Sequence, residues 1–170
     1  MSDQIINRVA SSAIISIDLE SFYPEGERVV FDIKNNLYED TILREKEFRA
    51  FIKEHDWSMY KGKNVAITCS VEAIVPTWAY MLIASKLTPI ANHFIFGDLH
   101  ELEKDLFSIA LSKVKIEKYR DAKIVVKGCS NNAIPISAYV ELVRILQPIT
   151  ASIMFGEPCS TVPVYKKPRG

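Results

Sequence analysis

The stretch that decides the fold is residues 76–98, PTWAYMLIASKLTPIANHFIFGD, because the chain contains a second version of it. Residues 135–157 read PISAYVELVRILQPITASIMFGE and align with the first stretch without a gap. Eight of the 22 positions from 76 to 97 are identical, where ordinary composition gives about one or two. The identical pairs are Pro76/Pro135, Ala79/Ala138, Tyr80/Tyr139, Leu87/Leu146, Pro89/Pro148, Ile90/Ile149, Phe96/Phe155 and Gly97/Gly156. The pattern indicates an internal repeat.

The repeat extends upstream into two apolar strands. Residues 64–68 and 123–127 are each followed by a Cys-Ser pair after one deleted residue, so the repeat covers residues 64–98 and 123–157. Within and between the repeats, the pattern predicts helices over residues 76–87, 99–115 and 135–146 and strands over residues 93–96 and 152–155. Alternating strands and helices are typical of a mostly parallel sheet with helices on both faces. We therefore expect a three-layer α/β/α fold.

The N-terminal part is expected to decorate the edge of that sheet. Two short apolar runs, residues 13–19 and 29–33, flank the turn-forming residues 24–27, Pro-Glu-Gly-Glu. This arrangement predicts a β-hairpin, and the apolar spacing of residues 41–52 predicts a helix after it. A chain of 170 residues buries one sizeable core, so residues 1–170 are interpreted as one domain. The tail from residue 164 is expected to fray.

Composition excludes several classes of function. The 21 basic and 21 acidic residues balance to a net charge of zero, which gives no footprint for nucleic acid or an anionic membrane. The longest apolar stretch, residues 78–84, is far shorter than the roughly 20 residues of a membrane-spanning helix. No secretion signal opens the sequence, so a cytoplasmic location is expected. Three cysteines disfavour a disulfide framework.

The cysteines are the residues with the most chemical interest. If the two repeats sit back to back, strands 64–68 and 123–127 are neighbours, and Cys69 and Cys129 share the crevice at their carboxyl ends. Neighbouring strands lie about 4.8 Å apart, so the two thiols would be able to share a ligand. Cys159 follows the last strand, and the repeat pairs its position with His100.

Three thiolates and an imidazole form a tetrahedral zinc set, and cysteine-rich sites also hold iron–sulfur clusters. Cys69, Cys129, Cys159 and His100 are therefore the candidate metal ligands, although no short Cys-x-x-Cys pair is present. His100 is the weakest of the four, since water or a nearby carboxylate can take its place. Two alternatives stay open: inert burial of the cysteines and a single reactive thiol. The other histidines, His55 and His93, are interpreted as structural.

Catalysis is not indicated. Neither cysteine loop has a glycine-rich phosphate-binding pattern, and residues 70–77 and 130–137 contain no arginine of the kind a phosphatase-like cysteine loop needs. No serine lies in a nucleophile elbow, and no carboxylate pair stands out. A non-catalytic role is therefore the favoured interpretation, with the substrate, if one exists, beyond the sequence.

The sequence resembles an uncharacterised bacterial family catalogued as domain of unknown function twenty-four-eighty. The resemblance covers essentially the whole chain. It rests on residues 18–28, DLESFYPEGER, on His55-Asp-Trp57, on Pro76-Thr-Trp-Ala-Tyr80, on Phe96-Gly-Asp98 and on residues 156–163, GEPCSTVP. It implies no particular activity, but an association with iron–sulfur assembly. That association favours the cysteine hypothesis for Cys69, Cys129 and Cys159 and not for His100.

Two functions follow as expectations. The first is a metal- or sulfur-binding accessory factor that uses zinc or an iron–sulfur cluster and has iron–sulfur assembly proteins as partners. The alternative is a protein-interaction domain with inert buried cysteines. The second is favoured by the helix over residues 76–87, which has Leu82 and Ser85 where its repeat has Glu141 and Arg144. Its extra apolar surface is expected to face the core or a second subunit in a homodimer.

Overall fold

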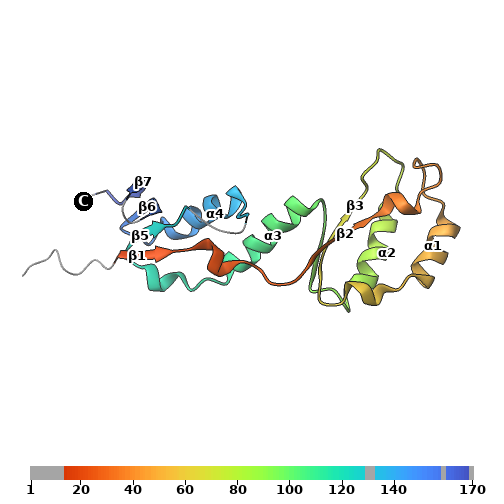
Figure 1. The fold of residues 1–170 in the computed structure, drawn as a ribbon, viewed down its shortest axis with the longest axis horizontal. Helices are drawn as coiled ribbons and strands as arrows, with labels where there is room; N and C mark the ends of the chain where they lie inside the picture. Colours follow the sequence, from red (N-terminus) through yellow and green to blue (C-terminus); the bar gives the residue numbers. More distant parts are fainter. Residues whose placement is uncertain (1–13, 129–132, 158–159, 169–170) are drawn as a thin grey trace, which may run out of the picture. The chain divides into compact units, whose positions relative to one another are not determined.

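The computed structural model describes residues 14–128, 133–157 and 160–168. The chain divides into two compact units (Figure 1). We call residues 24–106 the central unit and residues 1–23 together with 107–170 the terminal unit. Each unit has its own sheet. In sequence, therefore, the central unit interrupts the terminal unit.

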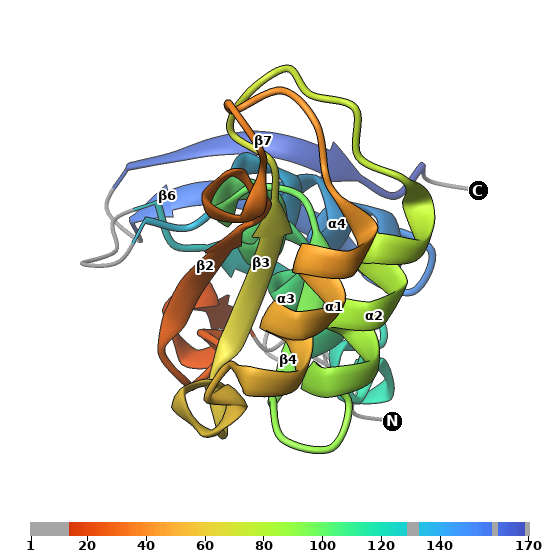
Figure 2. The same ribbon diagram turned by 90° about the vertical axis from the view of Figure 1, so that its right-hand side faces the viewer.

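The central unit is a three-layer α/β/α structure. Its parallel strands β2 (Arg28–Asp32), β3 (Asn64–Thr68) and β4 (His93–Phe96) lie in the order β2-β3-β4. Helices α1 (Glu45–Glu54) and α2 (Thr77–Leu87) cover one face (Figure 2). On the other face, α3 (Leu99–Ser112) packs Leu102 and Leu106 against Ala66 and Ile95.

The terminal unit has a four-stranded sheet in the order β1-β5-β6-β7. Strands β1 (Ile14–Ile17), β5 (Lys123–Val126) and β6 (Ser152–Glu157) are parallel, and β7 (Ser160–Lys166) is antiparallel to β6. Helix α4 (Ile136–Leu146) and the last part of α3 contribute Leu142, Leu146, Phe107 and Leu111 to its core.

Both units follow one order of elements. In the central unit, β2 leads into the 3₁₀ turn η2 (Ile33–Asn36), then α1, a second 3₁₀ turn η3 (Trp57–Tyr60), β3, α2 and β4. In the terminal unit, β1 leads into η1 (Leu19–Phe22), and the chain later continues through α3, η4 (Ile116–Tyr119), β5, α4 and β6. Strand β7 has no counterpart in the central unit.

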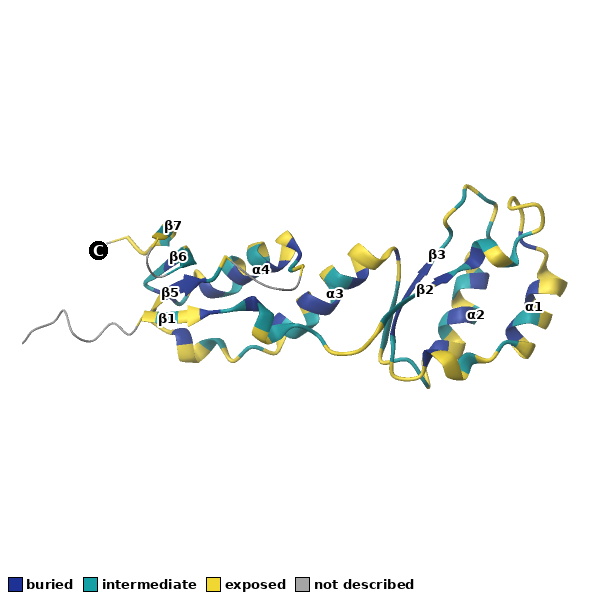
Figure 3. Cartoon of the chain, in the orientation of Figure 1, coloured by how far each residue is buried: buried dark blue, intermediate teal, exposed yellow. Residues whose placement is uncertain are grey.

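The helices after the middle strands show how sequence dictates this order. Pro76 and Pro135 are the N-caps of α2 and α4, with φ of −61° and −65°, the angle at which a proline ring is already fixed. The inward positions then match at the helical spacing of three and four residues (Figure 3). These buried residues are Ala79, Ile83 and Leu87 in α2 and Ala138, Leu142 and Leu146 in α4. Burying each of the larger side chains stabilises the fold by about 1.5–3 kcal/mol.

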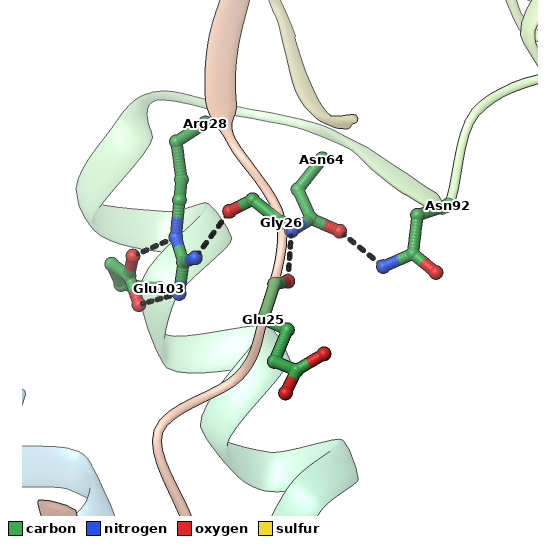
Figure 4. A network of polar contacts seen from close by, with 6 residues as sticks. All are labelled: Glu25, Gly26, Arg28, Asn64, Asn92 and Glu103. Carbon is green, nitrogen blue, oxygen red and sulfur yellow. Dashed lines mark hydrogen bonds and ion pairs between the residues drawn. The ribbon is translucent and has the colours of Figure 1, made fainter. Parts of the chain in front are cut away.

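A polar network fastens the amino end of β2 in the central unit (Figure 4). Arg28 forms an ion pair with Glu103 of α3, with Nε 2.5 Å from Oε1. The fully buried Asn64 donates to the Glu25 carbonyl at 2.9 Å and accepts from Asn92 at 2.7 Å. Gly26 has φ of +97°, and a Cβ there would lie 2.8 Å from the Asn64 amide nitrogen, so glycine is required for this turn.

The α/β class and the mostly parallel pairing are confirmed. Strands 64–68 and 93–96 have the predicted bounds. The two N-terminal strands do lie at sheet edges, but the hairpin between them was wrong. Strand β1 pairs in parallel with β5, and β2 pairs in parallel with β3, in separate sheets. The turn at residues 24–27 thus links two units instead of two paired strands.

Two further expectations are corrected. The strands before Cys69 and Cys129, β3 and β5, are not neighbours, because they belong to different sheets. The tail does not fray at residue 164, since Val164 to Lys166 complete β7 and Lys167 donates its amide to the Ala151 carbonyl at 2.9 Å. That all of residues 1–170 unfold as one domain stays a prediction. Within the described part of the chain, no helix combines the length and the apolar character needed to cross a membrane.

Candidate functional site

The carboxyl edge of the central sheet is organised around Asp32, the last residue of β2. Its Oδ1 accepts hydrogen bonds from the backbone amides of Lys34, at 3.0 Å, and Ser70, at 3.1 Å. Burial works to raise the pKa of Asp32, but the hydrogen bonds from the Ser70 side chain and from these two amides outweigh it, so the pKa is lowered. Asp32 is therefore a charged group that ties the ends of β2 and β3 together.

Cys69 and Tyr80 lie beside this carboxylate. The Cys69 thiol is half-buried and donates to the Val71 carbonyl at 3.2 Å. The pKa of Tyr80 is raised, first by burial and then by the negative charges of Cys69 and Asp32. The Tyr80 ring meets Phe96 of β4 edge to face, with centroids 5.1 Å apart. A hydrogen-bonded thiol in such surroundings is typical of an inert cysteine.

The terminal unit has the same residue types at the matching positions. Asp18 follows β1, accepts from the Glu20 amide at 2.9 Å and lies 3.3 Å from the Lys127 amine. Tyr139 of α4 meets Phe155 of β6 edge to face at 5.8 Å. At Gly128 a Cβ would lie 2.8 Å from the Phe155 ring, so the ring occupies space that only glycine leaves free.

An apolar hollow of about 480 Å³ lies beside Gly128, between α4, β6 and β7. Its walls include Ile136, Val140, Val143, Ile153, Phe155 and Val164. Ile136 is 80% exposed and Val140 is 65% exposed, although both are aliphatic side chains on one stripe of α4. A concave apolar surface of this size is within the range of ligand and partner sites in proteins.

The predicted metal ligands fare differently. Cys69 lies at the carboxyl edge of the central sheet, as expected. His100 is exposed in the first turn of α3. Cys129 and Cys159 lie outside the described residues. Among the residues that the structure describes, no three His, Cys, Asp or Glu side chains gather as a metal site would require. The shared crevice of Cys69 and Cys129 rested on neighbouring strands, and it loses that basis.

Asp98 has a purely structural part in this region. It caps α3, because its Oδ1 accepts from the Glu101 amide at 2.8 Å while Glu101 accepts from the Asp98 amide at 3.0 Å. This reciprocal arrangement is a capping box. His93, at the start of β4, pairs with Asp105 of α3, with Nε2 2.6 Å from Oδ2.

Sequence reasoning missed the two aspartates at the sheet edges. Asp18 stands in Ile17-Asp18-Leu19 and Asp32 in Phe31-Asp32-Ile33, a carboxylate between two buried apolar residues. This was the available signal, because a charged residue directly after an apolar strand marks the end where ligands bind in parallel sheets.

The comparisons agree with this architecture. The fold defines a mostly parallel α/β protein built from two units with the same order of elements. Residues 3–167 match the family described as Protein of unknown function (DUF2480), and the chain belongs to that family. Neither the curated proteins nor the solved structures gave a match.

Proposed function

We propose that this protein is a non-catalytic accessory factor that binds a metal ion or sulfur through thiols at the carboxyl edge of the terminal sheet. The observation that carries the proposal is the parallel pairing of β5 with β6, in which Val126 lies opposite Phe155. Cys129 comes three residues after Val126 in the sequence, and Cys159 is in the two-residue connection from β6 to β7. Three residues span at most about 10 Å, so both thiols start from one edge.

The likeness of the two sheet edges narrows the ligand set. Cys69 belongs to the other sheet, and its thiol already donates to the Val71 carbonyl. We therefore assign the ligands to Cys129 and Cys159 and leave Cys69 out. Zinc or an iron–sulfur cluster suits cysteine ligands, and further donors would come from Glu157, water or a partner protein. In this proposal the protein works in the bacterial cytoplasm with iron–sulfur assembly proteins, without nucleic acid or membrane.

We also infer that the two units are copies of one ancestral unit. The inference is supported by the common element order, by the aligned residues of α2 and α4, and by the two edge-to-face pairs Tyr80–Phe96 and Tyr139–Phe155. On this account the thiol position was inherited by both units, and only the terminal unit acquired a second thiol at the neighbouring strand.

The experiment is elemental analysis and absorption spectroscopy of protein purified without air and without chelator. We expect close to one equivalent of zinc, or an iron–sulfur chromophore, in the wild type, loss of it in Cys129→Ser and Cys159→Ser, and retention in Cys69→Ser. Cys69→Ser is the matched control, since it removes the equivalent thiol of the other unit. A wild type without metal, or equal loss in all three variants, overturns the assignment.

The apolar hollow favours a second candidate, a protein-interaction domain that can form a homodimer. Exposed aliphatic side chains on α4 and β7 line it, and such surfaces are common at interfaces. Light scattering during size-exclusion chromatography tests this candidate with Val140→Asp, which places a charge at an exposed position. A wild-type dimer that becomes a monomer in the variant supports the candidate, and a strict monomer at tens of micromolar removes the homodimer.

A further inference from the structure

A second hollow, of about 300 Å³, lies beside β2 in the central unit. Its polar walls are Asp32, Asn35, Asn36 and His55, and its apolar walls include Phe31 and Tyr60. Neither the cysteines nor the apolar hollow of the terminal unit takes part in it. The inference drawn from it goes beyond the proposed function.

His55 is the residue that makes this hollow unusual. Its Nε2 is buried and has no hydrogen-bond partner among the described residues. Aromatic rings surround the imidazole, with centroid distances of 4.7 Å to Phe51, 4.8 Å to Trp57 and 5.8 Å to Tyr60. Buried polar atoms in native proteins nearly always have a partner. An unsatisfied nitrogen in the wall of a hollow therefore points to a missing ligand group.

The charges around the hollow favour a cation. Asp32 is a charged carboxylate, and the side-chain oxygens of Asn35 and Asn36 and a neutral imidazole nitrogen are able to accept hydrogen bonds. No lysine or arginine is among the residues that line the hollow. Lys34 acts on Asp32 electrostatically but does not line it. Aromatic rings attract a positive charge further, whereas an anionic ligand would face Asp32 without compensation.

The terminal unit has the matching hollow, of about 340 Å³, and supplies its own cations there. Asp18, Lys118 and Tyr119 line it, and the Lys118 amine lies 4.8 Å from the centroid of the Tyr119 ring. The Lys127 amine is 3.3 Å from Asp18. In the aligned register, Lys118 and Tyr119 correspond to Met59 and Tyr60, and Lys127 corresponds to Thr68. The central unit therefore keeps the carboxylate and the tyrosine but lacks both amines.

We propose that the hollow of the central unit binds a small organic cation, an ammonium or amidinium group on a flat apolar body. The cation takes the place that lysine amines hold in the terminal unit. Its N–H groups donate to the Asp32 carboxylate and to His55 Nε2, and its apolar body contacts the aromatic walls. Since Nε2 is closed off from water, the imidazole turns toward the hollow when the ligand enters, and the gain of a hydrogen-bond partner favours that turn.

The test uses three probes of one shape and different charge: benzylammonium, benzyl alcohol and benzoate. Full-length protein is titrated with each, and the amide signals of β2 and η2 and the indole signal of Trp57 are followed by NMR. We expect saturable shifts with benzylammonium, at a dissociation constant in the millimolar range or tighter. We expect binding to benzyl alcohol to be weaker by about tenfold and no binding to benzoate. Absence of saturable shifts with benzylammonium, or equal binding of benzoate, overturns the proposal.

A matched pair of variants at Met59 separates a specific site from loose adsorption. Met59 is 52% exposed, so Met59→Lys and Met59→Gln are both compatible with folding. Met59→Lys restores the amine found in the terminal unit and is expected to abolish benzylammonium binding, whereas Met59→Gln keeps it. His55→Phe retains an aromatic ring without the acceptor and is expected to weaken binding about tenfold. Equal affinity in Met59→Lys and Met59→Gln would contradict the proposal.

Discussion

The central and terminal units build the same order of elements but complete their sheet edges with different charges. In the terminal unit, Asp18 is paired with the amine of Lys127, and Lys118 lies over the Tyr119 ring. In the central unit, Asp32 is held by backbone amides, and the matching hollow has no cationic side chain in its walls. One architecture thus provides a neutralised site in one unit and an anionic site in the other.

The third strands differ in a second way. Strand β6 is followed by β7, which pairs with it and forms one wall of the apolar hollow. Strand β4 is the last strand of its sheet, and the chain continues directly into α3 across the opposite face. The comparison teaches that the strand order fixes where ligand groups gather, while a few substitutions and one added strand decide which ligand they suit.

The largest expected effect comes from matched core substitutions. Leu87 in α2 and Leu146 in α4 are both fully buried, so changing either to Ala is expected to cost about 2–5 kcal/mol of unfolding free energy. Urea unfolding of the two variants also tests the single-domain prediction. One transition that both variants shift indicates one cooperative domain, whereas two transitions, each shifted by one variant, would show that the units unfold separately.

A smaller difference is expected between two matched glycines. Gly156 has φ of +125°, and a Cβ there would meet the backbone carbonyl of Ser160, its partner strand. Gly97 has φ of +150°, but its Cβ would meet only the side chain of Glu101, which is able to move. We expect Gly156→Ala to lower the unfolding free energy by about 1–3 kcal/mol more than Gly97→Ala. Thermal denaturation measures this, and equal losses would show that β7 does not constrain the turn.

The smallest effect concerns the carboxylate of the central unit. Asp32→Asn is expected to cost about 1–2 kcal/mol at neutral pH, because it weakens the hydrogen bonds from the Lys34 and Ser70 amides. The pKa of Asp32 is lowered on folding, so its contribution is present above the unfolded pKa of about 3.9 and is lost as the pH falls through the folded value. Unfolding free energies measured against pH should therefore converge for wild type and variant in acid. A constant difference would contradict the assignment.

Much of the architecture was predictable because the repeat is contiguous in sequence. Strands β3 and β4 and the helix between them follow apolar runs bounded by proline and glycine, and their bounds agree closely. Strand β7 was not predicted, because Pro163 and the cations of the tail are typical of a frayed end. The sheet assignment failed since nothing in residues 14–32 shows that β1 and β2 pair with strands far along the chain.

The hollows were unpredictable for a related reason. Asp18 and Asp32 are 14 positions apart, whereas Tyr60 and Tyr119 are separated by the 59 positions of the main repeat. A search at one fixed spacing finds only the second pair. The central unit interrupts the terminal unit between η1 and α3, so the first strand of each unit falls out of register with the rest. His55 gives no sequence signal, because its burial among aromatic rings depends on packing of α1 and η3.

The most direct test of the comparison is a single two-ligand NMR experiment on full-length protein. Amide spectra are recorded before and after removal of metal by a chelator, and then during titration with benzylammonium. The account predicts two separate sets of shifted amides: β5, β6 and α4 on metal removal, and β2, η2 and η3 with benzylammonium. Shifts of Thr68 and Cys69 on metal removal, or of residues around Asp18 with benzylammonium, would contradict it.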